Sequence, residues 1–192
     1  MNHLLTSIVT DAHGDEFAIS LRFTLETGLV HDNNCTTSFF IVNLCLSKED
    51  NQRSVKQLQK VVEKLSESES DVAVVLGGFN FGLKISPSRA MRLYKSRRYA
   101  ELFSFDERLI SLSKFEKFNS LLNEGRINFR PVLQTKLRLP FLGCCAGVTE
   151  SEYLTWADRI FFSRGVEVIG YTAASFFHGG KHFPVACIAK LC

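Results

Sequence analysis

Three short segments hold the residue types that could do chemistry. Asn80 follows an apolar run, Asp158 lies in a Trp-Ala-Asp-Arg-Ile stretch, and His182 follows two glycines and a lysine. A histidine oriented by an aspartate can transfer protons, and an amide can donate to a developing oxyanion. A structural interpretation stays open beside this one. A loop asparagine often forms a turn, and a buried Asp158–His182 pair could serve stability alone.

The bulk composition indicates one domain without a strong overall charge. The 192 residues are 45% hydrophobic, which suits a single domain over 1–192 with a real core. The 23 basic and 20 acidic residues give a net charge of +3, too small to indicate a nucleic-acid partner. A local basic cluster is either a solvated helix face or a surface for phosphate or peripheral membrane contact: Arg89, Arg92, Lys95, Arg97 and Arg98.

Cysteine usage and the absence of sorting signals indicate in which cellular compartment the protein is expected. The six cysteines show no CxxC spacing, and the sequence contains neither a recognisable secretory signal nor an apolar run long enough to cross a membrane. We therefore expect a reduced, cytoplasmic protein with free thiols and no transmembrane segment, in which the cysteines are structural.

Hydrophobic periodicity predicts strands with interspersed helices. Alternation over 17–25 predicts a half-buried strand, and the apolar runs 38–46 and 71–76 predict buried strands joined by a helix over 55–65. A helix between two buried strands indicates an α/β layered domain. Further expectations are a helix from Ser86-Pro87 with interrupted helical character to 112 and a helix with a capping box of Ser113 and Glu116. We also expect a turn-rich stretch over 28–37, a loop with short strand pieces over 128–152, and strands over 158–163, 166–171 and 183–191.

In order and spacing, these segments resemble the catalytic domain of the inositol polyphosphate 5-phosphatases, a branch of the endonuclease/exonuclease/phosphatase superfamily. Segment 77–80 (GGFN) resembles the GDxN motif, 155–161 (TWADRIF) resembles PSWCDRIL, and 178–185 (HGGKHFPV) resembles SDHxPV. The resemblance runs roughly from residue 8 to residue 191. Four further segments support it in the same order, namely 16–23 with KGAVAVRF, 40–47 with FVNSHLAA, 106–109 with DQL and 123–131 with EGxIxFxPTYKY.

The resemblance implies a four-layer α-β-β-α sandwich of the DNase I-like type and a particular chemistry. In the family, water attacks a phosphate monoester while Mg²⁺ neutralises the phosphate charge. Asn80 matches the donor to the transition state, Asp158 the aspartate that orients the histidine, and His182 that histidine. Within the same motifs, Arg159 and Lys181 are the candidate substrate-binding cations.

Residues that would supply the base and hold the metal are replaced. Gly78 stands where the family has the aspartate base, Lys181 where it has a metal-side aspartate, and Cys45 where it has the histidine of FVNSHLAA. Gly82, Gln134 and Glu152 likewise remove positive charge from phosphate-contacting positions. Because so few residues precede the strand at 17–25, we expect the family's first strands and its metal-binding glutamate to be missing, and we assign no metal ligand.

These matches and losses together predict a degenerate 5-phosphatase-like domain, inactive or strongly impaired, that acts as a binding or regulatory module without a cofactor. Its expected partners are an inositol phosphate or phosphoinositide head group and a protein. Two alternatives stay open. One is an active Mg²⁺-dependent 5-phosphatase, a hydrolase of phosphoinositides or inositol phosphates, completed by further sequence or by another chain. The other is a structural subunit of a larger assembly.

Overall fold

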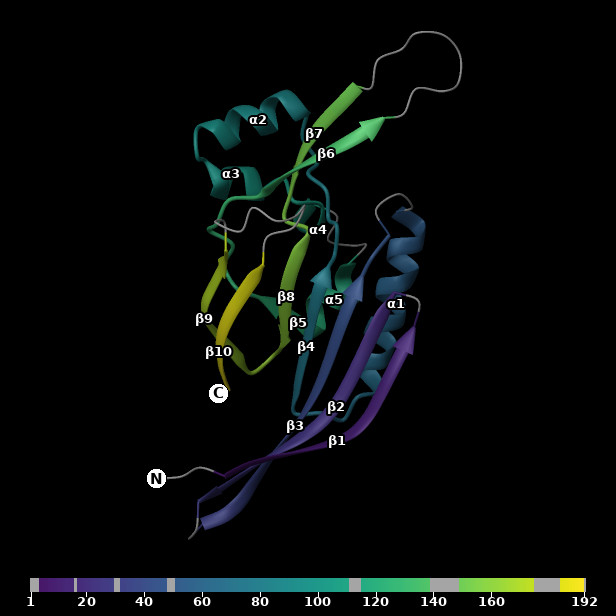
Figure 1. The fold of residues 1–192 in the computed structure, drawn as a ribbon, viewed down its shortest axis with the longest axis vertical. Coiled ribbons are helices and arrows are strands. Elements are labelled where there is room, and N and C mark those ends of the chain that lie inside the picture. The colour runs from purple at the N-terminus through teal and green to yellow at the C-terminus, as the bar shows by residue number, and fades with distance from the viewer. Residues whose placement is uncertain are drawn as a thin grey trace.

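A six-stranded mixed sheet forms the centre of the molecule (Figure 1). The computed structural model describes residues 4–15, 17–29, 32–47, 51–110, 115–138, 149–174 and 184–191. The strand order is β1-β2-β3-β4-β8-β5, and of the neighbours only β3 and β4 are parallel, with helix α1 as their crossover. Its elements are β1 (Leu4–Asp15), β2 (Ala18–Leu29), β3 (Asp32–Cys45), α1 (Asn51–Glu67), β4 (Val72–Gly78), β5 (Leu122–Glu124) and β8 (Asp158–Ser163).

One face of this sheet is sealed by helices α1 and α5 (Glu116–Leu121). Side chains alternate across a strand, and every second residue of the central strands points into this layer, among them Val42 and Val75, which are 1% and 0% exposed. Phe161 of β8 packs edge-to-face on Phe118 of α5, with ring centroids 4.9 Å apart. The helices supply their apolar stripe through Leu58, Val61, Val62, Leu65 and Phe118.

A second core lies at the end of the sheet where β4 and β8 meet the remaining elements. Trp156, which follows β7, is 2% exposed and donates from Nε1 to the Phe129 carbonyl at 3.1 Å. Its ring meets Phe103 edge-to-face. The elements that contribute to this core include α2 (Pro87–Lys95), α3 (Tyr99–Phe103), β7 (Thr149–Thr155), β9 (Val166–Ala173) and β10 (Val185–Leu191). The remaining elements are α4 (Glu107–Ile110) and β6 (Val132–Arg138), which pairs with β7.

None of the helices in the described segments is long and apolar enough to cross a membrane.

The structure confirms most predicted elements and corrects three. Segment 28–37 was expected to be turn-rich, but β2 and β3 extend into it, whereas the short strand pieces expected within 128–152 are found as β6 and β7. A strand was not expected at Leu4–Asp15, yet it pairs with β2 as the edge of the sheet. The start of the last helix is also corrected, because α5 begins at Glu116 with Phe115 at its N-cap; Ser113 of the predicted capping box lies outside the described residues.

Candidate functional site

Three residues from neighbouring strands meet at the carboxyl end of β4. The strand registers place Cys45 of β3 and Asp158 of β8 on either side of Gly78. A β-carbon at Gly78 would lie 3.6 Å from Cys45 Sγ, 3.8 Å from Asn80 Nδ2 and 3.9 Å from Asp158 Oδ1. The sequence-predicted residues Asn80 and Asp158 are thus brought together, with Cys45 beside them.

Asn80 occupies the turn that follows β4. Its φ of 53° lies in the left-handed region, which asparagine tolerates better than most residues. Its Nδ2 donates to the Leu46 carbonyl at 2.8 Å, and its backbone N–H reaches the Ala157 carbonyl at 3.3 Å. The turn-former interpretation therefore accounts for Nδ2, whereas Oδ1 of Asn80 is buried with no hydrogen-bond partner among the described residues. Its role as a donor to substrate stays a prediction.

The rest of the predicted site lies outside the described residues. His182 and Lys181 belong to 175–183, so the expected contact of His182 with Asp158 near Asn80 stays a prediction. Gln134 and Glu152 lie on the paired strands β6 and β7, whose side chains at these positions are likewise not described. Beside Asp158, the described residues line a hollow of about 10 Å³, about the volume that one water needs.

The groups gathered at Gly78 do not fit Mg²⁺. This ion prefers oxygen ligands, chiefly carboxylates, phosphates and water. The groups nearest Gly78 are one carboxylate, one thiol and the amide of Asn80, whose Oδ1 is buried without a partner among the described residues, so they offer one carboxylate and one amide oxygen. Within the described segments, no group of three His, Cys, Asp or Glu residues is placed to hold a metal ion. We derive no catalytic step through a metal from these residues.

Arg159 is a core residue, which corrects its assignment to substrate binding. Its side chain is fully buried, and every nitrogen of its guanidinium donates to a buried carboxylate. Nη1 donates to both oxygens of Asp106 at 3.0 Å, while Nε and Nη2 donate to Glu124 at 2.7 and 2.5 Å. Arg108 also bonds Glu124, at 3.2 Å, which completes a buried cluster of two cations and two carboxylates.

Aromatic rings surround this cluster, and burial and the neighbouring carboxylates shift the pKa of Arg159. The Arg159 guanidinium carbon lies 5.2 Å from the Phe81 ring centroid and 5.5 Å from that of Phe161. Burial alone would lower the pKa of Arg159, but the carboxylates of Glu124 and Asp106 outweigh burial and raise it. Sequence reasoning placed both carboxylates in segments that resemble family motifs, but missed the cluster because pairing across distant segments leaves no local periodicity.

Tyr171 joins the same cluster through its hydroxyl, and burial raises the pKa of its phenol well above the ordinary value, with Glu124 adding to the shift. A raised folded-state pKa gives stability that is complete below the unfolded pKa of about 10 and is lost as the pH rises above it. We therefore predict that wild type loses more unfolding free energy between pH 9 and pH 11 than Tyr171→Phe does, measured by urea denaturation.

Tyr94→Phe on the surface helix α2 is the matched control and should follow the wild type. Equal slopes for wild type and Tyr171→Phe would contradict the prediction.

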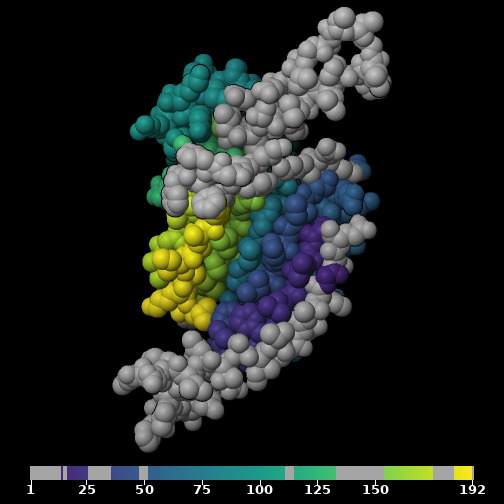
Figure 2. All heavy atoms as spheres, viewed as in Figure 1, coloured from purple at the N-terminus to yellow at the C-terminus, as the bar shows by residue number. Residues whose placement is uncertain are grey.

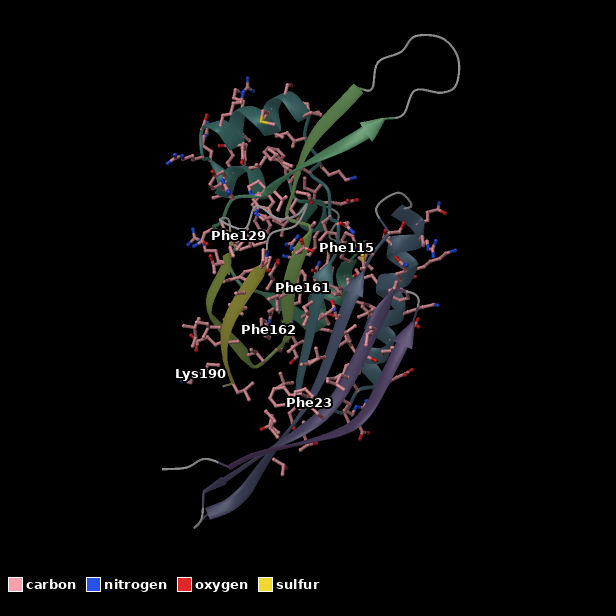
Figure 3. All side chains as sticks on the ribbon, viewed as in Figure 1. Phe23, Phe115, Phe129, Phe161, Phe162 and Lys190 are labelled. Atoms are coloured by element: carbon pink, nitrogen blue, oxygen red, sulfur yellow. The ribbon has the colours of Figure 1, made fainter. Side chains whose placement is uncertain are left out.

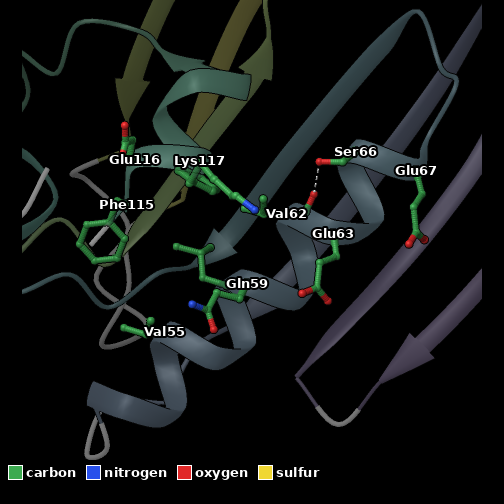
Figure 4. Close-up of a pocket in the computed structure, with 11 residues that line it drawn as sticks. Val55, Gln59, Val62, Glu63, Ser66, Glu67, Phe115, Glu116 and Lys117 are labelled. Carbon is green, nitrogen blue, oxygen red and sulfur yellow. Dashed lines mark hydrogen bonds between the residues drawn. The ribbon is translucent and has the colours of Figure 1, made fainter. Parts of the chain in front are cut away.

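A larger cavity lies elsewhere, between α1 and the start of α5 (Figure 4). Its volume is about 450 Å³, its floor is apolar, and its rim carries Glu63, Glu67, Glu116 and Lys117. It lies on the helix-covered side of the sheet, apart from the Gly78 site. It contains no residue of the three motifs.

Comparison with known proteins identifies the fold but not the family. No protein-family model matches the sequence, and no curated protein does. Among solved structures, the inositol polyphosphate 5-phosphatase domain of SPsynaptojanin, in complex with inositol (1,4)-bisphosphate and calcium ion, matches with a TM-score of 0.66 and 17% identity. The match covers 98% of this chain and 56% of that one.

A second structure of the same fold is a ferrous NO complex of a mutant Cimex nitrophorin, with a TM-score of 0.62 and 16% identity over 96% of this chain and 63% of that one. The chain therefore spans little more than half of these neighbours. The α/β sandwich predicted from the sequence is confirmed. The two neighbours were solved with different ligands, so the function has to be argued from the site.

Proposed function

We propose that this chain is a 5-phosphatase-like domain that binds an inositol phosphate or phosphoinositide head group without hydrolysing it at a family-like rate. Gly78 carries the proposal. The motif resemblance puts a carboxylate base at this position, and a side chain there would face Asn80 and Asp158. Glycine supplies no base to activate water, and loss of such a group costs on the order of 10²- to 10⁴-fold in rate.

Two further considerations support binding by this module. The SPsynaptojanin domain of the same fold was solved with inositol (1,4)-bisphosphate. Lys181 adjoins His182 in sequence and would offer a fixed positive charge near the site. Affinity resting on so few cations should be modest and strongly salt-dependent. In this proposal, binding serves a regulatory role. The domain would act in the cytoplasm or peripherally at membranes.

The activity test uses inositol (1,4)-bisphosphate with and without Mg²⁺. We predict no phosphate release above background by the purified chain in a malachite-green assay. Release that requires Mg²⁺ and disappears in His182→Ala would overturn the proposal. That result would favour the alternative of a working phosphatase completed by further sequence or by another chain. The match covers only 56% of the SPsynaptojanin domain.

Binding is tested separately by calorimetry, with EDTA present to exclude metal-dependent association. We expect weak, salt-dependent binding of inositol (1,4)-bisphosphate that is reduced at least fivefold in Lys181→Ala. Lys117→Ala, an exposed lysine at the α1–α5 cavity, is the matched control and should bind as wild type does. Absence of binding by wild type would leave the structural-subunit alternative, which obligate co-purification with partner proteins would support.

A further inference from the structure

Helix α2 and the turn after it concentrate positive charge in a way that the rest of the chain does not. Segment 86–100 holds five of the 23 basic residues and none of the 20 acidic ones. Outside it, 18 basic and 20 acidic residues remain, a net charge of −2. All five basic residues are exposed. We call them the basic patch: Arg89, Arg92, Lys95, Arg97 and Arg98.

The basic patch faces solvent because the other side of α2 packs into the second core. Ala90 and Leu93 are 5% and 4% exposed, whereas Arg92 and Lys95 lie three residues apart on the outer side of the helix. In the space-filling view, α2 forms the surface at one end of the described chain (Figure 2). Side chains with nitrogen tips project from this end, away from the sheet (Figure 3).

Most of this charge has no acidic partner among the described residues. Arg98 pairs with Glu101. The ion pairs within the described segments do not include Arg92, Lys95 or Arg97. Because burying an unpaired charge is costly, these residues do not suit the apolar packing surface of another layer of the fold. They suit a surface that brings negative charge.

Arg97 occupies a backbone position that suits glycine. The Arg98 N–H donates to the Leu93 carbonyl at 3.0 Å, and the Arg97 N–H donates to the Tyr94 carbonyl at 3.0 Å. This pattern ends a helix with one left-handed residue, which is most often glycine. Here that residue is Arg97, with a φ of 56°. The helix dipole favours cations in the last turn, but Arg97 lies after that turn. An arginine held in such a conformation points to a use for its side chain.

The basic patch lies at the same end of the molecule as the Gly78 site. β4 runs toward this end, and the chain continues from Gly78 into α2 (Figure 1). Phe103 of α3 meets Trp156 edge-to-face, and Trp156 lies two residues before Asp158. A flat surface laid against α2 would therefore meet the end of the sheet at which Asn80 and Asp158 converge.

We propose that the basic patch docks the domain on an anionic lipid surface. Clusters of about four to eight Lys and Arg residues on an amphipathic helix are typical of such docking. Tyr94 and Tyr99 lie half-buried among the cations, with ring centroids 6.0 Å apart, and tyrosine rings are favoured at membrane interfaces. The inference goes beyond head-group binding, because the patch is attracted to the bulk negative charge of the surface and not to inositol phosphate.

A nucleic acid fits the charge distribution less well than a lipid surface does. A flat surface meets only one end of the molecule, and at 0.1 M ionic strength charges more than about 10 Å away are largely screened from it. An extended nucleic acid would run past the patch onto the remainder of the chain, whose net charge is −2.

The test is co-sedimentation of the purified chain with vesicles of phosphatidylcholine alone, or of phosphatidylcholine with phosphatidylserine. We expect binding only to the vesicles with phosphatidylserine, weakened by added salt. Each removed cation should lower partitioning about fivefold, so Arg92→Gln/Lys95→Gln should lower it at least tenfold. The matched control, Arg164→Gln/Lys190→Gln, removes two exposed cations at the other end of the sheet and should bind as wild type does (Figure 3).

Arg97→Gly separates loss of charge from loss of fold. Glycine adopts a φ of 56° without strain, so this variant should unfold at no lower a urea concentration than wild type. It should nevertheless bind the phosphatidylserine vesicles about fivefold less tightly.

Four results would overturn the proposal. Wild type might fail to bind the phosphatidylserine vesicles, the control double variant might lose as much binding as Arg92→Gln/Lys95→Gln, or Arg97→Gly might bind as wild type does. The fourth is that Arg92→Gln/Lys95→Gln weakens binding of a labelled single-stranded RNA but leaves vesicle binding unchanged. Vesicle binding without calorimetric binding of inositol (1,4)-bisphosphate would overturn only the head-group proposal, and the reverse would overturn only the lipid-surface proposal.

Discussion

Replacing Arg159 with leucine is expected to lower the free energy of unfolding by about 3–5 kcal/mol, the cost of removing one partner from a buried ion pair. The side chains of Arg159 and Asp106 are both 0% exposed, and that of Glu124 is 2% exposed. Without Arg159, Arg108 alone would face two buried carboxylates, and the cluster would change from neutral to a net negative charge. Urea denaturation followed by circular dichroism measures the loss.

Arg164→Leu is the matched control for this variant. Arg164 lies in the exposed turn after β8, and its Nε donates to the Ser120 carbonyl at 2.8 Å. Its replacement should cost about 0.5 kcal/mol or less, as surface changes usually do. The double variant Asp106→Leu/Arg159→Leu restores a neutral cluster and should unfold at a higher urea concentration than Arg159→Leu. A loss from Arg159→Leu no larger than the control's would contradict a stabilising role for the ion pairs.

The position of Arg159 also shows what the sequence left out. Its place in the Trp-Ala-Asp-Arg-Ile segment suggested a phosphate contact, since arginine is well suited to bind phosphate. The register between β4 and β8 instead places Arg159 in the core. Asp158 pairs with Gly78 and points to the end of β4, so the next residue, Arg159, points to the opposite side of the sheet, where Asp106 and Glu124 receive it. Partners 53 and 35 residues away leave no local pattern.

Predictions that rest on local periodicity agree better with the structure. The helix expected over 55–65 is the centre of α1, and the strand expected over 158–163 matches β8. Turn-forming composition over 28–37 was a weaker guide, because β2 and β3 gain backbone hydrogen bonds from each other well into that stretch. The convergence of Cys45, Asn80 and Asp158 on Gly78 follows from cross-strand pairing, which motif order suggested but could not specify.

The second large effect is expected from replacing Gly77, the first of two adjacent glycines at the end of β4. A β-carbon at Gly77 would lie 2.0 Å from the Leu44 carbonyl oxygen and 2.9 Å from the Leu44 nitrogen, and the φ of +122° is one that residues with side chains rarely adopt. Backbone cannot yield as a flexible side chain can, and β3 is paired on both sides here. Gly77→Ala is therefore expected to destabilise the chain by about 4 kcal/mol or more, or to prevent folding.

Gly78→Ala is the control that separates steric conflict from the loss of a glycine as such. The nearest atom to a β-carbon at Gly78 is Cys45 Sγ at 3.6 Å, an ordinary van der Waals distance. This variant should change the unfolding free energy by about 1 kcal/mol or less. Thermal and urea unfolding of both variants measure the difference, and equal destabilisation would contradict it. Because Gly78 has room for a side chain, its lack of a carboxylate is not enforced by packing. A tolerated Gly78→Asp variant would therefore place that group directly beside Asp158 and Asn80.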